Sequence, residues 1–316
     1  MFKKLVLSAA ALVSLSACSS FMESRETLAK RIAYPVFMLE RQIPAGDFNL
    51  MAWERVRKKG QPAHIYIEGD GMSWVSPSEP ALDPTPQNPL ALNLAAIDKH
   101  PNVIYIARPC QFSGNEIWRD ALPKYNGSDK GTCPHKYWTS DRYAEEVIGS
   151  MSKALDDIKK RYQISEFHVV GYSGGATVAA LLAADREDVK SFRTVAGNLD
   201  HEAFTTLHDV TPLSGSLNPV DRAAELRFIP QHHYVGGEDE VIPPAVFHSY
   251  QQAVAPSQCL AYTFVPDAGH EYGWVDQWPD LLKKPLGCSG RLEPADPSQF
   301  SAPPQEFIDV KKGKVF

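Results

Sequence analysis

The hydroxyl group of Ser173 is the side-chain group in this chain with the clearest potential for chemistry. It stands at the centre of the pentapeptide GYSGG (171–175), with an apolar run at 167–170 before it and another at 176–182 after it. This pattern predicts a strand, a sharp turn and a helix, because glycines beside a serine let the backbone turn tightly. The hydroxyl group would then project beyond the end of the strand, where it could attack a substrate.

A serine hydroxyl is a poor nucleophile at neutral pH, so it needs a base that accepts its proton during the attack. His270 follows the last predicted strand (260–265), in the turn sequence DAGH. Asp239 follows the strand predicted at 231–235, in the segment GGEDEVIP. A neutral imidazole can take the serine proton, and a carboxylate can orient the imidazole and stabilise its charged form. Ser173, Asp239 and His270 are therefore the candidate catalytic residues.

The acid has alternatives. Asp200 follows the strand predicted at 192–196 and is the main competitor, while Glu238 and Glu240 flank Asp239. Asp239 is favoured because it follows a glycine turn at a strand end and precedes a hydrophobic-proline helix start.

Four other histidines have less specific surroundings. His232 and His233 lie inside a predicted strand, where packing or a core hydrogen bond is the expected role. As neighbours on a strand they point to opposite faces and cannot bind one metal together. His201 and His208 follow the strand predicted at 192–196 and could line a cleft.

An acyl-transfer site also needs backbone N–H groups that stabilise the negative oxygen of the tetrahedral intermediate. The glycine-bearing segment EGDGMSW (68–74) follows the strand predicted at 63–67. We expect one N–H donor from Asp70 or Gly71 and the second from Gly174, the residue after the serine. The side chain of Asp70 is expected to be that of an ordinary turn residue.

Strands and helices alternate in the prediction for the rest of the chain. The predicted strands lie at 48–56, 63–67, 103–107, 166–170, 192–196, 231–235 and 260–265. The predicted helices lie at 90–99, 142–161, 176–184 and 245–253, the second with Thr139, Ser140 and Asp141 as candidate caps. This alternation is typical of a parallel sheet covered by helices on both faces, with the functional site at the carboxyl ends of the strands.

Ser173, Asp239 and His270 occur in the chain order of the α/β-hydrolase superfamily, which the chain resembles over about residues 48–282. The matching pieces are GYSGG, GGEDEVIP, DAGH and the turn EGDG. The resemblance implies an α/β-hydrolase fold: a mostly parallel central sheet, helices on both faces and a short cap region. It implies Ser173 as nucleophile, His270 as general base and acid, and Asp239 as the residue that fixes the histidine tautomer. Glu68 departs from the pattern, since many members carry a histidine there.

The amino terminus resembles the leader of a bacterial lipoprotein. A basic pair at 3–4 precedes an apolar run at 5–15 that is too short to span a bilayer and ends in LSAC. The resemblance implies cleavage before Cys18 and lipidation of that cysteine, which anchors a protein to one leaflet. Ser19 and Ser20 then imply the outer membrane, facing the periplasm. An ordinary signal peptide followed by a coincidental cysteine is the alternative.

Cleavage of 1–17 would leave 299 of the 316 residues and change the formal net charge from −6 to −8. This acidic balance argues against a nucleic-acid partner. We expect a tether and lead-in at 18–47, one hydrolase domain at 48–282 and a proline-rich extension at 283–316.

Four cysteines remain apart from Cys18, which fits disulfides in an oxidising compartment. We favour pairing Cys110 with Cys133 and Cys259 with Cys288, because each pair closes a local loop beside a predicted strand end. Buried free thiols are the alternative.

No cofactor or metal is expected. The chain contains no HExxH, no spaced Cys/His cluster, no Walker loop and no GxGxxG that opens a helix.

Substrate choice depends on segments that the sequence describes only coarsely. The region 200–227 is short for a cap, so a fairly open cleft is expected, shaped by a proline-rich loop at 74–89 and a segment at 108–138. Arg108 could bind a substrate carboxylate, although an ion pair that fixes its loop is the more common role.

The favoured function is a serine hydrolase that acts on a small-molecule or lipid-like acyl ester. A peptide or amide hydrolase, an acyltransferase with the same catalytic residues and a non-catalytic lipoprotein scaffold are the alternatives. The oligomeric state is left open.

Overall fold

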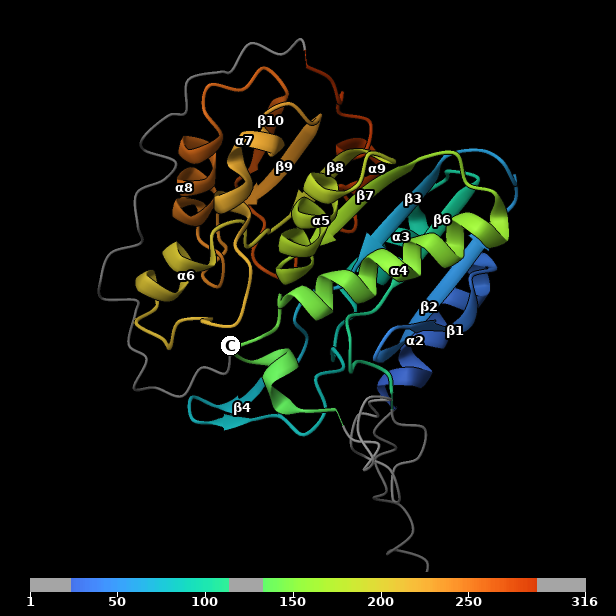
Figure 1. Cartoon of the computed structure of the whole chain (residues 1–316), viewed down its shortest axis with the longest axis horizontal. Helices are drawn as coiled ribbons and strands as arrows, with labels where there is room; N and C mark the ends of the chain where they lie inside the picture. Colours follow the sequence, from blue (N-terminus) through green and yellow to red (C-terminus); the bar gives the residue numbers. More distant parts are fainter. Residues whose placement is uncertain (1–23, 114–132, 289–316) are drawn as a thin grey trace, which may run out of the picture.

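The computed structural model describes residues 24–113 and 133–288, which contain one large sheet of eight strands (Figure 1). In spatial order the strands are β1 (Leu39–Ala45), β2 (Phe48–Val56), β6 (Asn102–Ile106), β3 (Ala63–Ile67), β7 (Phe167–Tyr172), β8 (Val189–Val195), β9 (Gln231–Gly236) and β10 (Leu260–Val265). β2 runs in the opposite direction to the other strands, and the six strands from β6 to β10 are parallel to one another. The predicted mostly parallel sheet is confirmed. A short hairpin of β4 (Trp74–Ser76) and β5 (Glu79–Pro80) lies outside it.

Helices cover both faces of the sheet, as Figure 1 shows. They are α2 (Arg25–Ala33), α3 (Leu90–Ile97), α4 (Glu145–Tyr162), α5 (Gly174–Asp185), α6 (His201–Leu207), α7 (Ala223–Leu226), α8 (Pro244–Val254) and α9 (Trp278–Leu281), with 3₁₀ turns η1 (Tyr34–Val36), η2 (His135–Trp138) and η3 (Pro219–Arg222). Residues of α4, α5 and α8 share one buried apolar cluster, and residues of α2, α3 and α9 share a second. The sheet therefore separates two cores.

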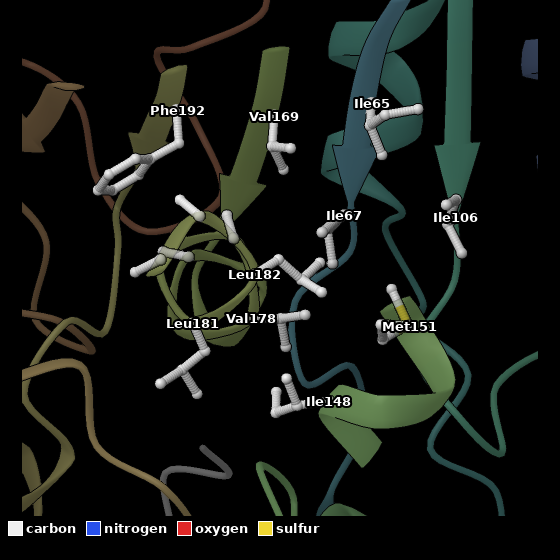
Figure 2. Packing of buried hydrophobic residues seen from close by; sticks show 14 of the residues in the cluster. Ile65, Ile67, Ile106, Ile148, Met151, Val169, Val178, Leu181, Leu182 and Phe192 are labelled. Carbon is white, nitrogen blue, oxygen red and sulfur yellow. The ribbon is translucent and has the colours of Figure 1, made fainter. Parts of the chain in front are cut away.

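The strands supply both cores because successive side chains point to opposite faces. In β3, Ile65 and Ile67 belong to the cluster under α4 and α5, whereas Tyr66 belongs to the cluster under α3 and α9. Figure 2 shows Ile67 opposite Leu182 and Val178 of α5. Strands buried on both faces explain the nearly continuous apolar runs in the sequence.

The amino-terminal edge differs from the prediction. The lead-in was expected to extend to residue 47, but α2 packs against α3, and β1 pairs with β2 along its whole length. The folded unit therefore begins before residue 48. The sequence pattern did not indicate β1 because it is an edge strand whose side chains from Leu39 to Gln42 are exposed.

The start of α4 also differs. The helix begins at Glu145, after an N-cap at Ala144 that makes no side-chain capping bond, so Thr139, Ser140 and Asp141 are not its caps. Acidic residues in the first turn favour the helix start without a capping side chain. Arg142, which was expected in the helix, lies in the turn before it.

The structure joins Cys110 to Cys133 and Cys259 to Cys288, which is the favoured pairing. No helix in the described part of the chain is long and apolar enough to cross a membrane. The predicted leader, Cys18 and most of the expected extension 283–316 lie outside the described residues.

Candidate active site

Ser173 forms the turn between β7 and α5. Its backbone has φ 50° and ψ −121°, a conformation that residues other than glycine rarely adopt. Its N–H donates to Val195 O at 3.0 Å, and its carbonyl accepts from the N–H groups of Ala176 and Asn198 at 3.0 and 3.1 Å. These bonds hold the strained turn in place at the carboxyl end of β7.

Two glycines of the pentapeptide are required by close backbone contacts. A Cβ atom on Gly171 would lie 2.3 Å from the carbonyl oxygen of Gly175. A Cβ atom on Gly175 would lie 2.4 Å from the carbonyl oxygen of Ile67. Both distances are far shorter than van der Waals contact, so α5 can follow β7 this closely only if both positions lack a side chain.

The structure brings together the three predicted catalytic side chains. His270 lies in the loop after β10, and its Nε2 is 3.0 Å from Ser173 Oγ. Its Nδ1 lies 3.0 and 3.1 Å from the two carboxylate oxygens of Asp239, in the loop after β9. Asp239 Oδ1 also accepts from the N–H groups of Val241 and Ile242 at 2.9 and 2.8 Å. These bonds fix the carboxylate, and the carboxylate in turn orients the imidazole.

The alternative acid lies elsewhere. Asp200 is the N-cap of α6, where Oδ1 accepts from the N–H groups of Glu202 and Ala203, both at 3.1 Å. Its second oxygen accepts from the hydroxyl group of Ser249. Asp200 therefore stabilises the start of α6, and the structure favours Asp239 over it as the partner of His270.

The other four histidines considered from the sequence are buried. In β9, His232 Nε2 lies 2.8 Å from Thr263 Oγ1 and His233 Nδ1 lies 2.8 Å from Thr194 Oγ1. Burial lowers the pKa of His232 to about 4. His201 and His208, considered as cleft residues, are only 4 and 5 % exposed on α6 and at its C-cap.

The predicted oxyanion turn lies against Ser173. A Cβ atom on Gly69 would be 3.1 Å from Ser173 Cβ, so the turn after β3 passes directly beside the serine. Gln111 Nε2 donates to Gly69 O at 2.9 Å and holds this turn. Among the hydrogen bonds of the described residues, none is donated by the N–H groups of Asp70, Gly71 or Gly174.

Glu68, which stands where many α/β-hydrolases carry a histidine, is fully buried beneath the turn. Its Oε1 accepts from Gly69 N–H at 2.9 Å and from Ala91 N–H at 3.4 Å, and its Oε2 accepts from the hydroxyl group of Tyr105 at 3.0 Å. Burial raises the pKa of Glu68 to about 7, although these bonds favour the ionised form. The carboxyl group ties the turn to α3 and β6.

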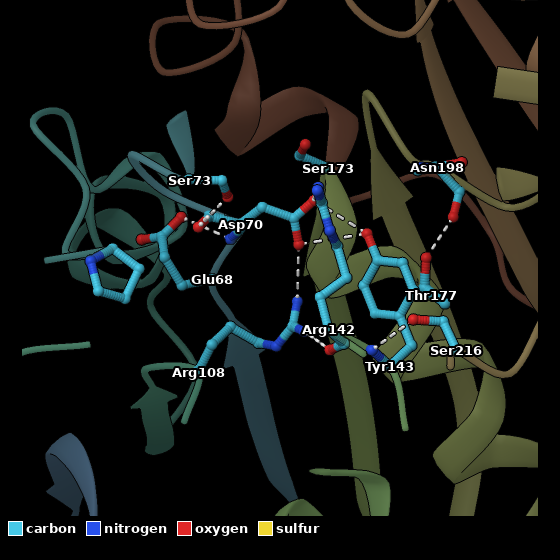
Figure 3. A network of polar contacts seen from close by, with 12 residues as sticks. Glu68, Asp70, Ser73, Arg108, Arg142, Tyr143, Ser173, Thr177, Asn198 and Ser216 are labelled. Carbon is cyan, nitrogen blue, oxygen red and sulfur yellow. Dashed lines mark hydrogen bonds and ion pairs between the residues drawn. The ribbon is translucent and has the colours of Figure 1, made fainter. Parts of the chain in front are cut away.

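The side chain of Asp70 is not the ordinary turn residue that was expected. It accepts from Arg108 Nη1 at 3.2 Å, from Arg142 Nη1 at 2.8 Å and from the hydroxyl group of Tyr143 at 2.9 Å (Figure 3). Arg108 makes an ion pair inside the protein, as expected. No sequence pattern indicated Arg142 and Tyr143 as partners of Asp70, because they lie more than 70 residues from it in the chain.

Among residues 24–113 and 133–288, no group of three or more His, Cys, Asp or Glu side chains is arranged to hold a metal ion.

Comparison with known proteins shows the fold. A family model described as an alpha/beta hydrolase of unknown function (DUF915) matches residues 140–203, the region that contains Ser173. No curated protein matches the chain.

Similar solved structures include the esterase Pf2001 of Pyrococcus furiosus, with 12% identity, a TM-score of 0.54 and coverage of 79% of this chain and 91% of that chain. Est1E from Butyrivibrio proteoclasticus has 11% identity and a TM-score of 0.52, over 77% of this chain and 97% of that chain. An acylaminoacyl peptidase of Pyrococcus horikoshii has 10% identity and a TM-score of 0.53, over 83% of this chain and 43% of that chain. The predicted α/β-hydrolase fold is confirmed.

Proposed function

We propose that the protein is a serine hydrolase that cleaves an ester, with Ser173 as nucleophile, His270 as general base and acid, and Asp239 as the acid that orients His270. The continuous chain of contacts from Ser173 Oγ through both ring nitrogens of His270 to the Asp239 carboxylate carries this proposal. The fold supports a hydrolase, because similar structures include an esterase and a peptidase.

The first half of the reaction follows from the geometry. Ser173 Oγ attacks the ester carbonyl while its proton passes to His270 Nε2, 3.0 Å away. The negative oxygen of the tetrahedral intermediate accepts hydrogen bonds from Gly174 N–H and from the N–H of Asp70 or Gly71. The intermediate collapses when His270 gives its proton to the leaving alkoxide, which departs as an alcohol and leaves an acyl group on Ser173.

The second half repeats these steps with water. His270 Nε2 takes a proton from water as the water oxygen attacks the acyl carbonyl. The second tetrahedral intermediate then releases the carboxylic acid, and the proton on His270 returns to Ser173 Oγ. Asp239 stabilises the imidazolium in both halves.

An acylaminoacyl peptidase among the similar structures keeps amide cleavage as the enzymatic alternative. The same acyl-enzyme could also transfer its acyl group to an alcohol acceptor. Measuring products from p-nitrophenyl esters of increasing chain length and from peptide amides, each with and without an added alcohol, separates these reactions. Faster cleavage of amides than of matched esters, or net transfer to the alcohol in water, would replace ester hydrolysis as the assigned reaction.

We also propose that Cys18 is lipidated after removal of residues 1–17 and that the domain is tethered in the bacterial envelope, at the outer membrane and facing the periplasm. The two disulfides support an oxidising compartment.

Labelling with a fluorophosphonate probe tests the catalytic proposal. We expect the probe to label the wild-type protein and to label neither Ser173→Ala nor His270→Ala, because the reaction needs the hydroxyl group and its base. Ser191→Ala is a matched control, since Ser191 is a buried serine in β8 that hydrogen-bonds His168. Folded wild-type protein that stays unlabelled would refute the proposal.

A further inference from the structure

Three segments that are distant in the sequence meet around the carboxylate of Asp70, as Figure 3 shows. Asp70 comes from the turn after β3, Arg108 from the segment after β6, and Arg142 and Tyr143 from the turn before α4. We call these four residues the Asp70 cluster. Its contacts to Asp70 Oδ1 and Oδ2 lie between 2.8 and 3.2 Å.

The cluster directly adjoins the nucleophile turn at Gly174. A Cβ atom on Gly174 would lie 2.1 Å from Asp70 Oδ1 and 2.5 Å from the Tyr143 hydroxyl oxygen. The carboxylate therefore packs against Gly174, the residue that follows Ser173 and whose N–H is a predicted oxyanion donor. Asp70 is thus connected to the predicted oxyanion site twice, once through its own backbone and once through this contact.

The charges in the cluster do not cancel. Two guanidinium groups face one carboxylate, and the side chains of Arg108 and Arg142 are only 4 and 11 % exposed. Burial by itself would raise the pKa of Asp70, but Arg142 and Arg108 outweigh it and hold the pKa below its ordinary value. The carboxylate stays ionised at neutral pH, so its bonds to both arginines are charge-assisted.

Each arginine is itself fixed by backbone groups. Arg108 Nη2 donates to Arg142 O, which links the two cationic residues, and Arg142 Nε donates to Thr139 O at 2.8 Å. Tyr143 N–H donates to Ser216 Oγ at 3.1 Å, which joins the cluster to the segment between α6 and η3. The carboxylate thus has little freedom to move.

We propose that the Asp70 cluster positions the oxyanion turn, so that Arg108, Arg142 and Tyr143 act on the reaction through Asp70 and not through contact with the substrate. The inference rests on the proposed hydrolase function. Its physical reason is that backbone donors stabilise a transition state only if they are already in place when the oxyanion forms. A displacement of about 1 Å in such a site lowers the rate on the order of 100-fold.

Asp70→Asn and Arg142→Met test this role, since both keep side-chain volume and remove a charge. We expect kcat for a p-nitrophenyl ester to fall on the order of 10- to 100-fold while KM changes by no more than about threefold, because the donors act mainly in the transition state. Arg142→Lys keeps one cationic donor and is expected to recover part of the lost kcat. Tyr143→Phe removes only a hydroxyl group and supplies a milder variant in case Asp70→Asn fails to fold.

Arg186→Met is the matched control. The Arg186 side chain is also 11 % exposed and also makes ion pairs, with Asp156 and Asp188, but it follows the carboxyl end of α5. We expect this variant to lose thermal stability and keep the wild-type kcat. A general structural effect would lower kcat in both arginine variants to a similar extent.

Two results would overturn the proposal. The first is a kcat within about twofold of wild type for folded Asp70→Asn, Arg142→Met and Tyr143→Phe. The second is a KM that rises for anionic esters alone with kcat unchanged, which would make Arg142 a substrate-binding residue. In both cases fluorophosphonate labelling of Ser173 in wild type would leave the hydrolase proposal standing, whereas unlabelled wild type would remove that proposal first.

Discussion

At the scale of single residues, the surroundings of Ser173 depend on two glycines, which have no side chain, and on the carboxylates of Glu68 and Asp70. Gly171 and Gly175 allow the close passage of backbone around the serine. Glu68 and Asp70 precede and follow Gly69 in the oxyanion turn. The Glu68 carboxyl group accepts from Gly69 N–H, and the Asp70 carboxylate pairs with Arg108 and Arg142. One of these carboxylates is paired with arginines and the other is not, so they respond differently to pH.

Glu68→Gln should remove a pH dependence of stability. The pKa of Glu68 is raised from 4.5 to about 7 in the folded protein, so between these values the folded state holds a proton that the unfolded state has lost. The free energy of unfolding therefore falls as pH rises through this window, by up to about 3 kcal/mol, and is level above it. The amide cannot ionise, so the variant should lack this slope.

Denaturant unfolding at pH 5 and pH 8 measures the difference. The free energy of unfolding of Glu68→Gln minus that of wild type should be larger at pH 8 than at pH 5. Glu187→Gln, in the exposed turn between α5 and β8, serves as the control and should change neither value. A wild-type slope that persists in Glu68→Gln would show that another group carries it.

At the scale of elements, the junction of β7 and α5 decides where Ser173 lies. Residues 174–183 are all buried, so α5 has no solvent-facing side along most of its length. It packs against β7 and β8 and beside α4, with Val178 and Leu182 toward Ile67 (Figure 2). A helix enclosed in this way cannot shift to accommodate a longer residue at its start.

Gly175→Ala should therefore be strongly destabilising. The new Cβ would lie 2.4 and 2.5 Å from the carbonyl oxygens of Ile67 and Glu68, which are backbone atoms of the strand end and the oxyanion turn. We expect a loss of about 2 kcal/mol or more in the free energy of unfolding, measured by denaturant titration.

Gly149→Ala in α4 is the matched control for this substitution. No heavy atom lies within 4 Å of the Cβ position at Gly149, so alanine should stabilise the helix by up to about 1 kcal/mol. Equal effects of the two substitutions would contradict the steric explanation for Gly175.

At the scale of the whole molecule, the amino-terminal end of the described chain lies beside the active-site loops. Arg25 donates to the carbonyl oxygens of Asp83 and Thr85 at 3.1 and 2.6 Å, and to Met72 Sδ at 3.2 Å. Cys18 precedes Arg25 by seven residues, which span at most roughly 25 Å. A lipid on Cys18 would hold the oxyanion-turn edge of the domain close to the membrane.

Cys18→Ser should separate the protein from the membrane without changing the site. We expect the wild-type protein to incorporate a labelled fatty acid and to sediment with membranes, and the variant to do neither. Activity on a soluble ester should be equal in both, while hydrolysis of an ester held in vesicles should be faster for wild type. Unlabelled wild-type protein that remains soluble would contradict lipidation.

The sequence by itself determined the elements whose cause is local or periodic. Strands β2, β3 and β10 have the predicted bounds, because apolar β-forming runs end at turn residues. Ser173, Asp239 and His270 could be selected because each follows such a run, and parallel strands bring their carboxyl ends to one edge of the sheet. The local sequence could not indicate β1, whose side chains are mostly exposed at the sheet edge.

Only the tertiary structure decided the partners of Asp70 and the use of Glu68. Arg142 and Tyr143 reach Asp70 from more than 70 residues away, and they lie in the turn before α4, which begins three residues later than its sequence pattern predicts. Pairing between distant charges leaves no periodic trace in a sequence, since it depends on which turns the sheet brings together. The turn that carries Ser173 is thus encoded locally, whereas the placement of the groups around it depends on the assembled fold.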